Sequence, residues 1–270
     1  MNRKNGILLY TPEDAARNRW FIEQLCHYAE PEGMTLRLCL SDSGEPYEIF
    51  SEDSAFLINR SRLAAYSQAA DRRNFPCFNS TAVTAITNDK FQTYLHLHGK
   101  HGIPMAATQQ IRRGSLPENL HYPLVAKPSD GHGGAGVTWI RNENELLQYS
   151  VADPFLIQEP VVTGWDVRIY ILGGEIYSAV LRTSDSDFRS NFSLGGKAQI
   201  ITPDAEMRAL VERVQQILPL DFAGVDLLRH PEGGYLLGEI EDAVGCRMLY
   251  QLTSLDPAKD FIRYLRSRLS

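Results

Sequence analysis

Gly224-Val-Asp226-Leu-Leu-Arg-His-Pro-Glu-Gly-Gly-Tyr-Leu-Leu-Gly-Glu239-Ile-Glu241-Asp242 is the stretch that decides the fold of this chain. Two short apolar runs flank residues 230–234, a Pro- and Gly-containing segment typical of a β-hairpin turn. Side chains alternate between the two faces of a strand, so Glu239 and Glu241 point the same way and Asp226 lies roughly opposite them. The hairpin is therefore expected to gather three carboxylates on one face.

Three carboxylates among Val, Leu and Ile need a counter-charge. Like charges ~4 Å apart repel by ~4 kcal/mol at an effective dielectric of ~20. A solvated acidic hairpin surface is one interpretation. The alternative is a site for Mg²⁺, which prefers hard oxygen ligands and is usually held by one or two carboxylates together with substrate phosphates. The sequence thus predicts a metal held by Asp226, Glu239 and Glu241, and it raises the question of where the phosphates bind.

Composition limits the class of protein. The chain has 270 residues, of which 43% are apolar and 22% are charged, enough for two globular domains or one large one. A formal net charge of −6 argues against a nucleic-acid or anionic-membrane partner, because both need a basic surface. We find no secretory signal and no apolar run of ~20 residues, and the four cysteines form no C-x-x-C pair. We expect a cytoplasmic protein with reduced thiols.

The first 85 residues alternate strand and helix patterns. Residues 6–10, 34–40 and 55–59 are strand-like, whereas residues 12–30 and 63–71 have helical spacing or composition. This alternation predicts a parallel sheet covered by helices. We find no catalytic pattern in this part of the chain.

The next distinctive segment is a glycine-rich loop at residues 128–136. A helix is expected at residues 88–98, and a strand at residues 122–127 delivers Lys127 to the loop. The loop satisfies G-x-G-x-x-G, but a strand-like segment follows it where a dinucleotide-binding site would have a helix, and protein-kinase and Walker motifs are absent. A hairpin without a ligand remains one alternative. The other is a flap whose backbone N–H groups close over phosphates, with Lys127 beneath.

The second half of the chain is predicted to contain more strands and two helices. Residues 155–162 form a strand, and residues 161–182 form two antiparallel strands that turn at Gly173-Gly174. A polar loop at residues 187–196 is long enough to reach over a site. Helices follow at residues 202–218 and 257–269. Asp166 and Arg168 share a face of their strand, and a surface salt-bridge ladder is an open interpretation for them.

Several short motifs follow one another along the chain, and their order is characteristic. They are Asn88-Asp89-Lys90 with Gly102-Ile-Pro104, Val125-Ala-Lys127-Pro with the glycine loop, Gln158-Glu159, Gly164-x-Asp166-x-Arg168, Asp187-Phe-Arg189-Ser-Asn191, and Phe222-Ala-Gly224-Val-Asp226 with Glu239-Ile-Glu241. In this combination the chain resembles the ATP-grasp superfamily, and most closely its RimK-type ATP-dependent carboxylate–amine ligases. The resemblance covers about residues 88–245. The branch usually has Asn at the position of Glu241.

The resemblance implies an α/β (α+β) ATP-grasp fold behind a small parallel α/β domain. The N-terminal domain would cover residues 1–85 and the ATP-grasp domain residues 86–270, with a lid lobe at 86–160 and a C-terminal lobe at 161–270. The implied nucleotide-binding residues are Lys90, Lys127, Gly131, Gly133, Gly134, Gly136, Gln158, Glu159 and Asp166. The implied metal ligands are Asp226, Glu239 and Glu241, and the implied catalytic residues are Arg168, Arg189 and Asn191.

The activity implied by the resemblance is formation of an amide or peptide bond. ATP would convert a carboxylate to an acyl phosphate, with Mg²⁺ or alternatively Mn²⁺, and an amine would then displace phosphate. Partners would be small-molecule or peptide acids and amines, and a homo-oligomer is compatible with the sequence. Two rival interpretations stay open: a catalytically silent nucleotide-binding protein, and an ATP-grasp kinase that phosphorylates a small molecule.

Overall fold

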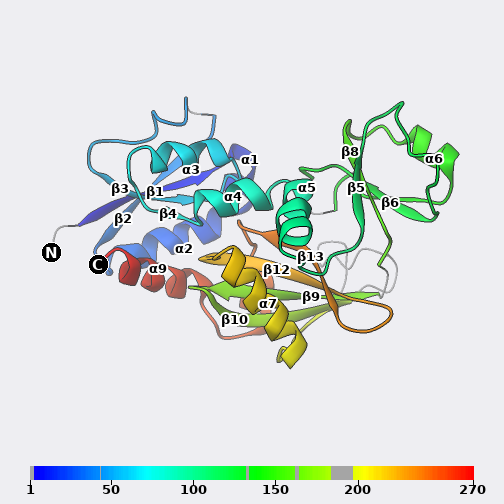
Figure 1. Cartoon of the computed structure of the whole chain (residues 1–270). Coiled ribbons are helices and arrows are strands. Elements are labelled where there is room, and N and C mark those ends of the chain that lie inside the picture. The colour runs from blue at the N-terminus through cyan, green and yellow to red at the C-terminus, as the bar shows by residue number, and fades with distance from the viewer. Residues whose placement is uncertain (1–2, 43, 132–133, 162–163, 184–196) are drawn as a thin grey trace.

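A computed structural model describes residues 3–42, 44–131, 134–161, 164–183 and 197–270, which within these ranges form three sheets (Figure 1). The first is built from β1 (Lys4–Tyr10), β2 (Met34–Leu40), β3 (Ser54–Asn59) and β4 (Cys77–Phe78). Its order is β2-β1-β3-β4 and all its pairs are parallel, which confirms the predicted parallel sheet. Its helices are α1 (Pro12–Arg17), α2 (Arg19–Ala29), α3 (Ala64–Asp71) and α4 (Thr81–Thr87). The helix predicted at residues 12–30 is divided at Asn18, which ends α1 and begins α2.

The second sheet is small and antiparallel. It contains β5 (Thr108–Ile111), β6 (Leu124–Lys127), β7 (Thr138–Ile140) and β8 (Phe155–Gln158) in the order β5-β8-β6-β7. Helix α6 (Glu143–Gln148) packs on it through the buried Leu146, and together they have a separate apolar cluster. This small lobe stands to one side of the rest of the molecule (Figure 1).

The third sheet contains the hairpin from which the fold was predicted. Its order is β11 (Lys197–Ile200), β10 (Glu175–Thr183), β9 (Trp165–Leu172), β12 (Phe222–Arg229) and β13 (Tyr235–Glu241), and its pairs are antiparallel. Gly224 pairs with Glu241 and Asp226 with Glu239, so the predicted hairpin and its register are confirmed. The turn between β9 and β10 falls at Gly173-Gly174, as predicted.

Helices cover both faces of this third sheet. Alternate residues of β9, such as Val167 and Ile169, pack against α7 (Ala205–Ile217). On the opposite face Tyr170 and Phe222 join one continuous core with α2, α8 (Arg247–Leu252), α9 (Pro257–Arg268) and the N-terminal parallel sheet. On that side the N-terminal unit therefore shares its hydrophobic core with the third sheet.

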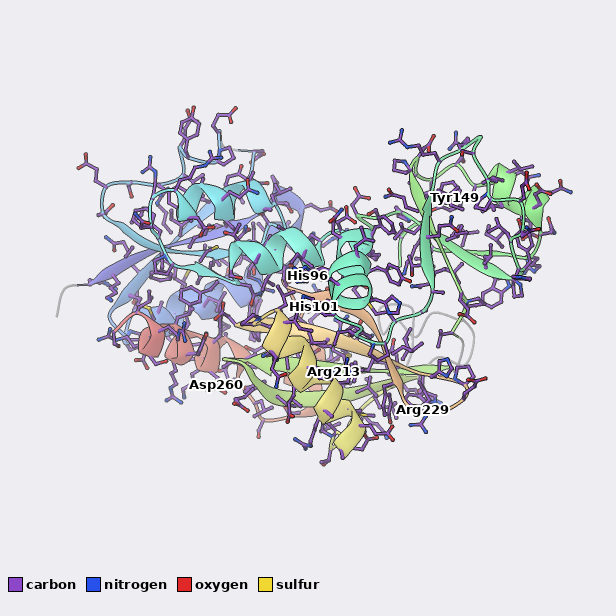
Figure 2. The ribbon with its side chains drawn as sticks, viewed as in Figure 1. His96, His101, Tyr149, Arg213, Arg229 and Asp260 are labelled. Atoms are coloured by element: carbon purple, nitrogen blue, oxygen red, sulfur yellow. The ribbon has the colours of Figure 1, made fainter. Side chains whose placement is uncertain are left out.

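The short helix α5 (Lys90–Thr93) runs directly into a π-helix, η1 (Tyr94–Lys100), at the centre of the molecule. The guanidinium of Arg213 on α7 donates to the carbonyl oxygen of Gly102 at 3.0 Å, which ties α7 to the end of η1 near His101 (Figure 2). In the part of the chain that the structure describes, every helix is too short or too polar to span a membrane.

Asn79, which follows β4, joins the N-terminal unit to the third sheet through four hydrogen bonds. Its Nδ2 donates to the carbonyl oxygens of Phe222 (2.9 Å) and Asp242 (3.0 Å), and its Oδ1 accepts from the backbone N–H groups of Asp221 and Phe222. Asn79 is only 3% exposed, so water cannot replace these partners.

We expect Asn79→Ala to lower the free energy of unfolding by about 3 kcal/mol, because it leaves backbone groups at the start of β12 and just after β13 without partners. Urea denaturation measures this change. Asn142→Ala is the matched control, since it removes only the N-cap bond of α6 and should cost about 1 kcal/mol. Equal losses in the two variants would contradict the joining role of Asn79.

Candidate nucleotide and metal site

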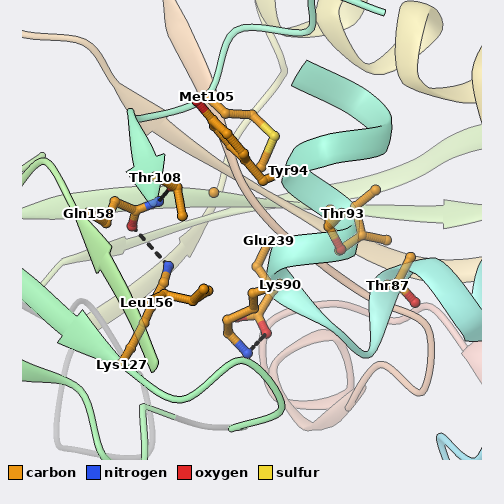
Figure 3. A pocket seen from close by; sticks show the side chains of 12 residues that line it. Thr87, Lys90, Thr93, Tyr94, Met105, Thr108, Lys127, Leu156, Gln158 and Glu239 are labelled. Carbon is orange, nitrogen blue, oxygen red and sulfur yellow. Dashed lines mark hydrogen bonds and ion pairs between the residues drawn. The ribbon is translucent and has the colours of Figure 1, made fainter. Parts of the chain in front are cut away.

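The candidate site is a pocket where α5, the hairpin β12–β13 and the small lobe meet (Figure 3). Its side chains border about 320 Å³ of space, part of which is open solvent. The residues that line it come from α5 and the segments on either side of it, from the hairpin and from the small lobe: Thr87, Lys90, Thr93, Tyr94, Met105, Thr108, Lys127, Leu156, Gln158, Gly238, Glu239 and Ile240. The two lysines and one of the carboxylates predicted from sequence therefore line the same pocket.

Lys90 occupies the first turn of α5. The Asp89 carboxylate caps this helix by accepting from the N–H groups of Phe91 and Gln92. Lys90 Nζ lies 3.1 Å from Oε1 of Glu239 and also donates to the carbonyl oxygen of Gly131 in the glycine loop. Of these two partners, Glu239 lines the pocket together with Lys90.

Lys127 lies at the end of β6, opposite Lys90. Its Nζ donates to Oε1 of Gln158 at 2.9 Å, and Gln158 Nε2 donates to the Thr108 hydroxyl at 2.8 Å. Burial lowers the pKa of Lys127 to about 8; Lys90 lowers it as well, and Glu239 opposes the shift. Among the described residues no carboxylate pairs directly with Lys127, and its burial disfavours the charged form, so a bound anion would stabilise that charge.

The glycine loop is docked on α5. Ser129 accepts the backbone N–H of Lys90 at 2.9 Å, and its hydroxyl donates to Asp89. Gly136 has a φ of +74°, and a Cβ there would come within 2.7 Å of Val151, so only glycine fits this position. The Tyr149 hydroxyl donates to the Gly136 carbonyl at 3.0 Å. Gly134 accepts the N–H of Val137, whereas Gly133 lies outside the described residues.

Like the described glycines of the loop, the predicted nucleotide residues Glu159 and Asp166 do not line the pocket. Glu159 is exposed, and its backbone N–H donates to the Ala107 carbonyl oxygen, which joins the end of β8 to the start of β5. Asp166 is 8% exposed and forms a bidentate pair with Arg182 at 2.6 and 2.9 Å. A role for either residue in binding nucleotide stays a prediction.

An unbroken chain of five charges crosses the third sheet. It runs from Asp166 to Arg182, then to Asp226, Arg168 and Glu241. Arg182 Nη2 lies 2.8 Å from Asp226, Arg168 donates to both oxygens of Asp226 at 2.7 and 2.8 Å, and Arg168 Nη1 lies 2.5 Å from Oε2 of Glu241. Asp166 and Arg168 therefore do form salt bridges, but in a buried network with other partners and not in the surface ladder that was one interpretation of the sequence.

The pKa values of these carboxylates follow from their neighbours. Burial alone would raise the pKa of Asp226, but Arg168 and Arg182 together hold it well below its usual range. Burial raises the pKa of Asp166 to about 6, because only Arg182 opposes it at close range and the Asp226 charge adds to the shift. Burial also raises the pKa of Glu241, against the effect of Arg168.

Gly224 allows Arg168 to cross from β9 to β13. A Cβ on Gly224 would lie 2.8 Å from Val244 and 3.4 Å from Cδ of Arg168. Because Gly224 has no side chain, the guanidinium can pass over β12 and reach Glu241 on the far strand. The Gly224-Val-Asp226 motif thus supplies both a space and a carboxylate for the same arginine.

The donor chemistry of the three predicted metal ligands fits Mg²⁺, but their side chains have partners within the protein. Asp226 accepts three N–H groups from arginines, Glu241 pairs with Arg168, and Glu239 pairs with Lys90. Among the described residues no three acidic, His or Cys side chains form a group able to hold a metal. Glu239 and Glu241 keep 33% and 29% of their side chains exposed. Oε2 of Glu241 is buried against Arg168, so only its other oxygen is left for a metal, whereas Asp226 is occupied by guanidinium groups.

The remaining predicted residues, Arg189 and Asn191, lie outside the described residues. Sequence reasoning missed Arg182, which joins Asp166 to Asp226. Counting residues back from the Gly173-Gly174 turn could have found it, but a register irregularity between Ile176 and Ser178 changes the pairing by one residue. Thr108 and Tyr94 were also missed, because no local pattern marks a pocket wall.

Comparisons with known proteins agree on one family. Residues 87–265 match the RimK-like ATP-grasp domain. The chain is 28% identical to the "Probable alpha-L-glutamate ligase" of Mannheimia succiniciproducens over 73% of this chain and 70% of that protein. It is 32% identical to the human "N-acetylaspartylglutamate synthase A" over 67% of this chain and 50% of that protein, so it spans about half of that relative. The structure of the ATP-grasp ligase PsnB, complexed with a phosphomimetic variant of its minimal precursor, Mg and ADP, has a TM-score of 0.68 at 14% identity and covers 100% of both chains.

The pKa of Lys127 should respond in opposite directions to its two charged neighbours. Lys90→Met should raise it, because a like charge is removed, and Glu239→Gln should lower it, because an opposite charge is removed. The rate of amine acylation at Lys127, followed by mass spectrometry as a function of pH, measures both shifts. Lys100→Met, on the exposed end of η1, should leave the profile unchanged; shifts of the same sign in the first two variants would refute the electrostatic assignment.

Proposed function

The chain belongs to the RimK-like ATP-grasp family, and from this premise we propose that its central pocket binds ATP with magnesium for ligation of a carboxylate to an amine. The protein is an ATP-dependent carboxylate–amine ligase, in keeping with relatives named as ligases and synthases. The observation that carries the assignment of the pocket is the convergence of Lys90, Lys127 and Glu239 on one space. Two cations and a carboxylate in a single pocket suit a metal-bound polyphosphate.

The pocket offers different surfaces to the two ends of a nucleotide. Tyr94, Met105 and Leu156 supply apolar walls suited to a flat aromatic ring. Lys90 and Lys127 supply positive charge for phosphates, and the docked glycine loop supplies backbone beside Lys90. When a phosphate replaces the carbonyl of Gly131 at Lys90, the loop loses one of its attachments to α5. Nucleotide binding would therefore change the position of the loop.

We propose that Glu239 and Glu241 are the principal carboxylates for Mg²⁺. Both side chains are partly exposed, and Mg²⁺ commonly uses one or two carboxylates together with phosphate oxygens. When bound, the metal neutralises phosphate charge and so lowers the barrier to phosphoryl transfer. Asp226 has another role in this proposal, because it fixes the guanidinium of Arg168 beside Glu241.

The chemistry asks the protein mainly for positioning and charge stabilisation. A substrate carboxylate attacks the γ-phosphate, ADP leaves, and the acyl phosphate then loses phosphate to an attacking amine. Lys90 and Lys127 would stabilise negative charge on the phosphates as it moves toward ADP. Arg168, held rigid by Asp226 and Glu241, would orient the anionic groups at the reacting end. The relatives' names point to amino-acid substrates, and we propose amino acids or peptides as the acid and the amine.

An assay of ADP release with pooled amino acids and peptides tests this function. We expect ADP only when both an acid and an amine are present, and an acyl hydroxamate when hydroxylamine replaces the amine. Lys127→Met should reduce turnover about 10²–10³-fold, because a preorganised charge is lost, while Lys100→Met should not. ADP release that needs no amine and yields no hydroxamate would replace the ligase with a kinase, and no release with any pool would favour a silent nucleotide-binding protein.

The two partly exposed carboxylates should differ in their metal dependence. Glu241→Asn keeps one oxygen donor and removes one negative charge, so we expect the Mg²⁺ concentration for half-maximal activity to rise about tenfold with comparable turnover at saturation. Glu239→Gln should abolish turnover at every Mg²⁺ concentration, because the pocket loses its only lining carboxylate among the described residues.

Magnesium titrations of turnover measure both effects, and Glu143→Gln on the distant helix α6 is the control. An unchanged Mg²⁺ dependence in Glu241→Asn would show that Glu241 serves Arg168 alone.

A further inference from the structure

A second pocket lies between the N-terminal unit and the end of β13. It is open to solvent, contains about 360 Å³ of space and shares no lining residue with the nucleotide pocket. Its described lining residues include three arginines, Arg17, Arg60 and Arg247, and no acidic side chain. A cationic pocket on a chain of net charge −6 is matched to an anionic ligand.

Arg60 is the unusual member of this set, because its charge is almost completely buried. The residue is 4% exposed, and no ion pair joins it to a carboxylate in the described ranges. Its Nη2 donates to the carbonyl oxygen of Val244 at 2.7 Å, whereas its Nε has no hydrogen-bond partner. Arginine remains charged in proteins, so a buried guanidinium with an unused N–H is costly unless something anionic pairs with it.

Aromatic rings hold this guanidinium in place. Its central carbon lies 5.2 Å from the Phe21 ring centroid, 5.7 Å from that of Tyr10 and 5.8 Å from that of Phe222. Such cation–π contacts offset part of the burial cost and fix the orientation of the planar group. The Tyr10 hydroxyl is also buried without a partner of hydrogen-bond geometry, although Arg60 is close enough to oppose the rise that burial causes in the pKa of Tyr10.

The mouth of the pocket combines charge with exposed aromatic surface. Trp20 is 53% exposed and packs edge-on against Tyr250, with ring centroids 4.7 Å apart. Arg247 at the start of α8 donates to the backbone carbonyl of Arg17 at the end of α1, so the two arginines are held together. An exposed tryptophan beside a cationic pocket favours a ligand that carries an anionic group on an apolar body.

We propose that this pocket binds a carboxylate borne by an aromatic or apolar body, and that this carboxylate is a recognition group of one substrate of the ligase. The inference rests on the proposed function. A carboxylate paired with the Arg60 guanidinium is a poor nucleophile, and neither Lys90 nor Lys127 lines this pocket. The bound carboxylate is therefore not the one that attacks ATP. It belongs to a substrate with a second reacting group, such as the α-carboxylate of an amino acid or the end of a peptide.

The place of the pocket in the fold supports a substrate role. Its wall includes Val244, Gly245 and Cys246, which follow Glu239–Glu241 after β13. Val244 also packs where Arg168 crosses Gly224, and the Tyr170 hydroxyl donates to the Gly245 carbonyl oxygen at 3.2 Å. A ligand anchored at Arg60 is thus connected through one short segment to the charges that the proposed chemistry uses.

Trp20 provides a direct readout of binding. Phenylacetate should change its fluorescence in a saturable way, and the neutral isostere phenylacetamide should bind at least about tenfold more weakly, because it cannot pair with a guanidinium. Trp20→Phe should remove the signal and leave that of the two remaining tryptophans. Arg247→Gln changes an exposed residue and should weaken phenylacetate binding severalfold, and Arg60→Lys should weaken it more. Arg60→Met should abolish binding in protein that keeps its native near-ultraviolet circular dichroism.

Equal binding of phenylacetate and phenylacetamide by the unmodified protein would overturn the inference, even if the Arg60 variants failed to fold. Equal phenylacetate affinity in the unmodified protein and in Arg247→Gln and Arg60→Lys would also overturn it. The same preparations are assayed for ADP release. Arginine-dependent phenylacetate binding without any ADP release would uphold this site and reject the proposed function. ADP release together with equal binding of phenylacetate and phenylacetamide, as read from Trp20 fluorescence, would uphold the proposed function and reject this site.

Discussion

The buried chain Asp166–Arg182–Asp226–Arg168–Glu241 is the interaction on which the rest of this structure depends. It links β10, β9, β12 and β13 through alternating charges, and each interior member lies between two opposite charges. Burial acts to raise the pKa of all three carboxylates. Two neighbouring arginines outweigh it at Asp226, whose pKa is lowered, whereas Asp166 and Glu241 at the ends of the chain have one close arginine each and their pKa values are raised. Loss of one partner from such a buried pair typically costs about 3–5 kcal/mol, so the chain also fixes which strands are neighbours.

The end at Glu241 connects this network to the proposed chemistry. Three carboxylates and two guanidinium groups leave one negative charge in excess, and an Asn at the last position would leave the chain neutral. The excess charge is carried by Glu241, whose side chain is partly exposed. Glu241 lies two residues after Glu239, which pairs with Lys90. A divalent cation with its phosphates would meet both the excess charge and the lysines of the pocket. Glu in place of the Asn that the RimK-type branch usually has thus changes the charge balance of the site.

Much of the fold could be predicted from the sequence, because strand alternation, turn residues and helical spacing are local signals. The parallel sheet, the Gly173-Gly174 turn and the hairpin register all followed from them. Short elements such as β5, α6, β11 and α8 were not predicted, since they acquire their apolar partners only through distant contacts. The site shows the same division: Lys90 and Lys127 were found through motifs, whereas Arg182 and the arginines that occupy Asp226 depend on register irregularities and strand order.

The apolar interior is unequally divided, and this has consequences for local opening. The N-terminal sheet, α2, α9 and one face of the third sheet share a single core, and Asn79 adds polar bonds across the same junction. The small lobe has a separate cluster of its own. In hydrogen-exchange experiments the first group should therefore protect its amides as one cooperative unit, with backbone on both sides of residue 79 exchanging together, while β5–β8 exchange as an independent unit of lower stability. The pocket proposed to bind nucleotide lies on the boundary between the two units, where ligand binding would couple them.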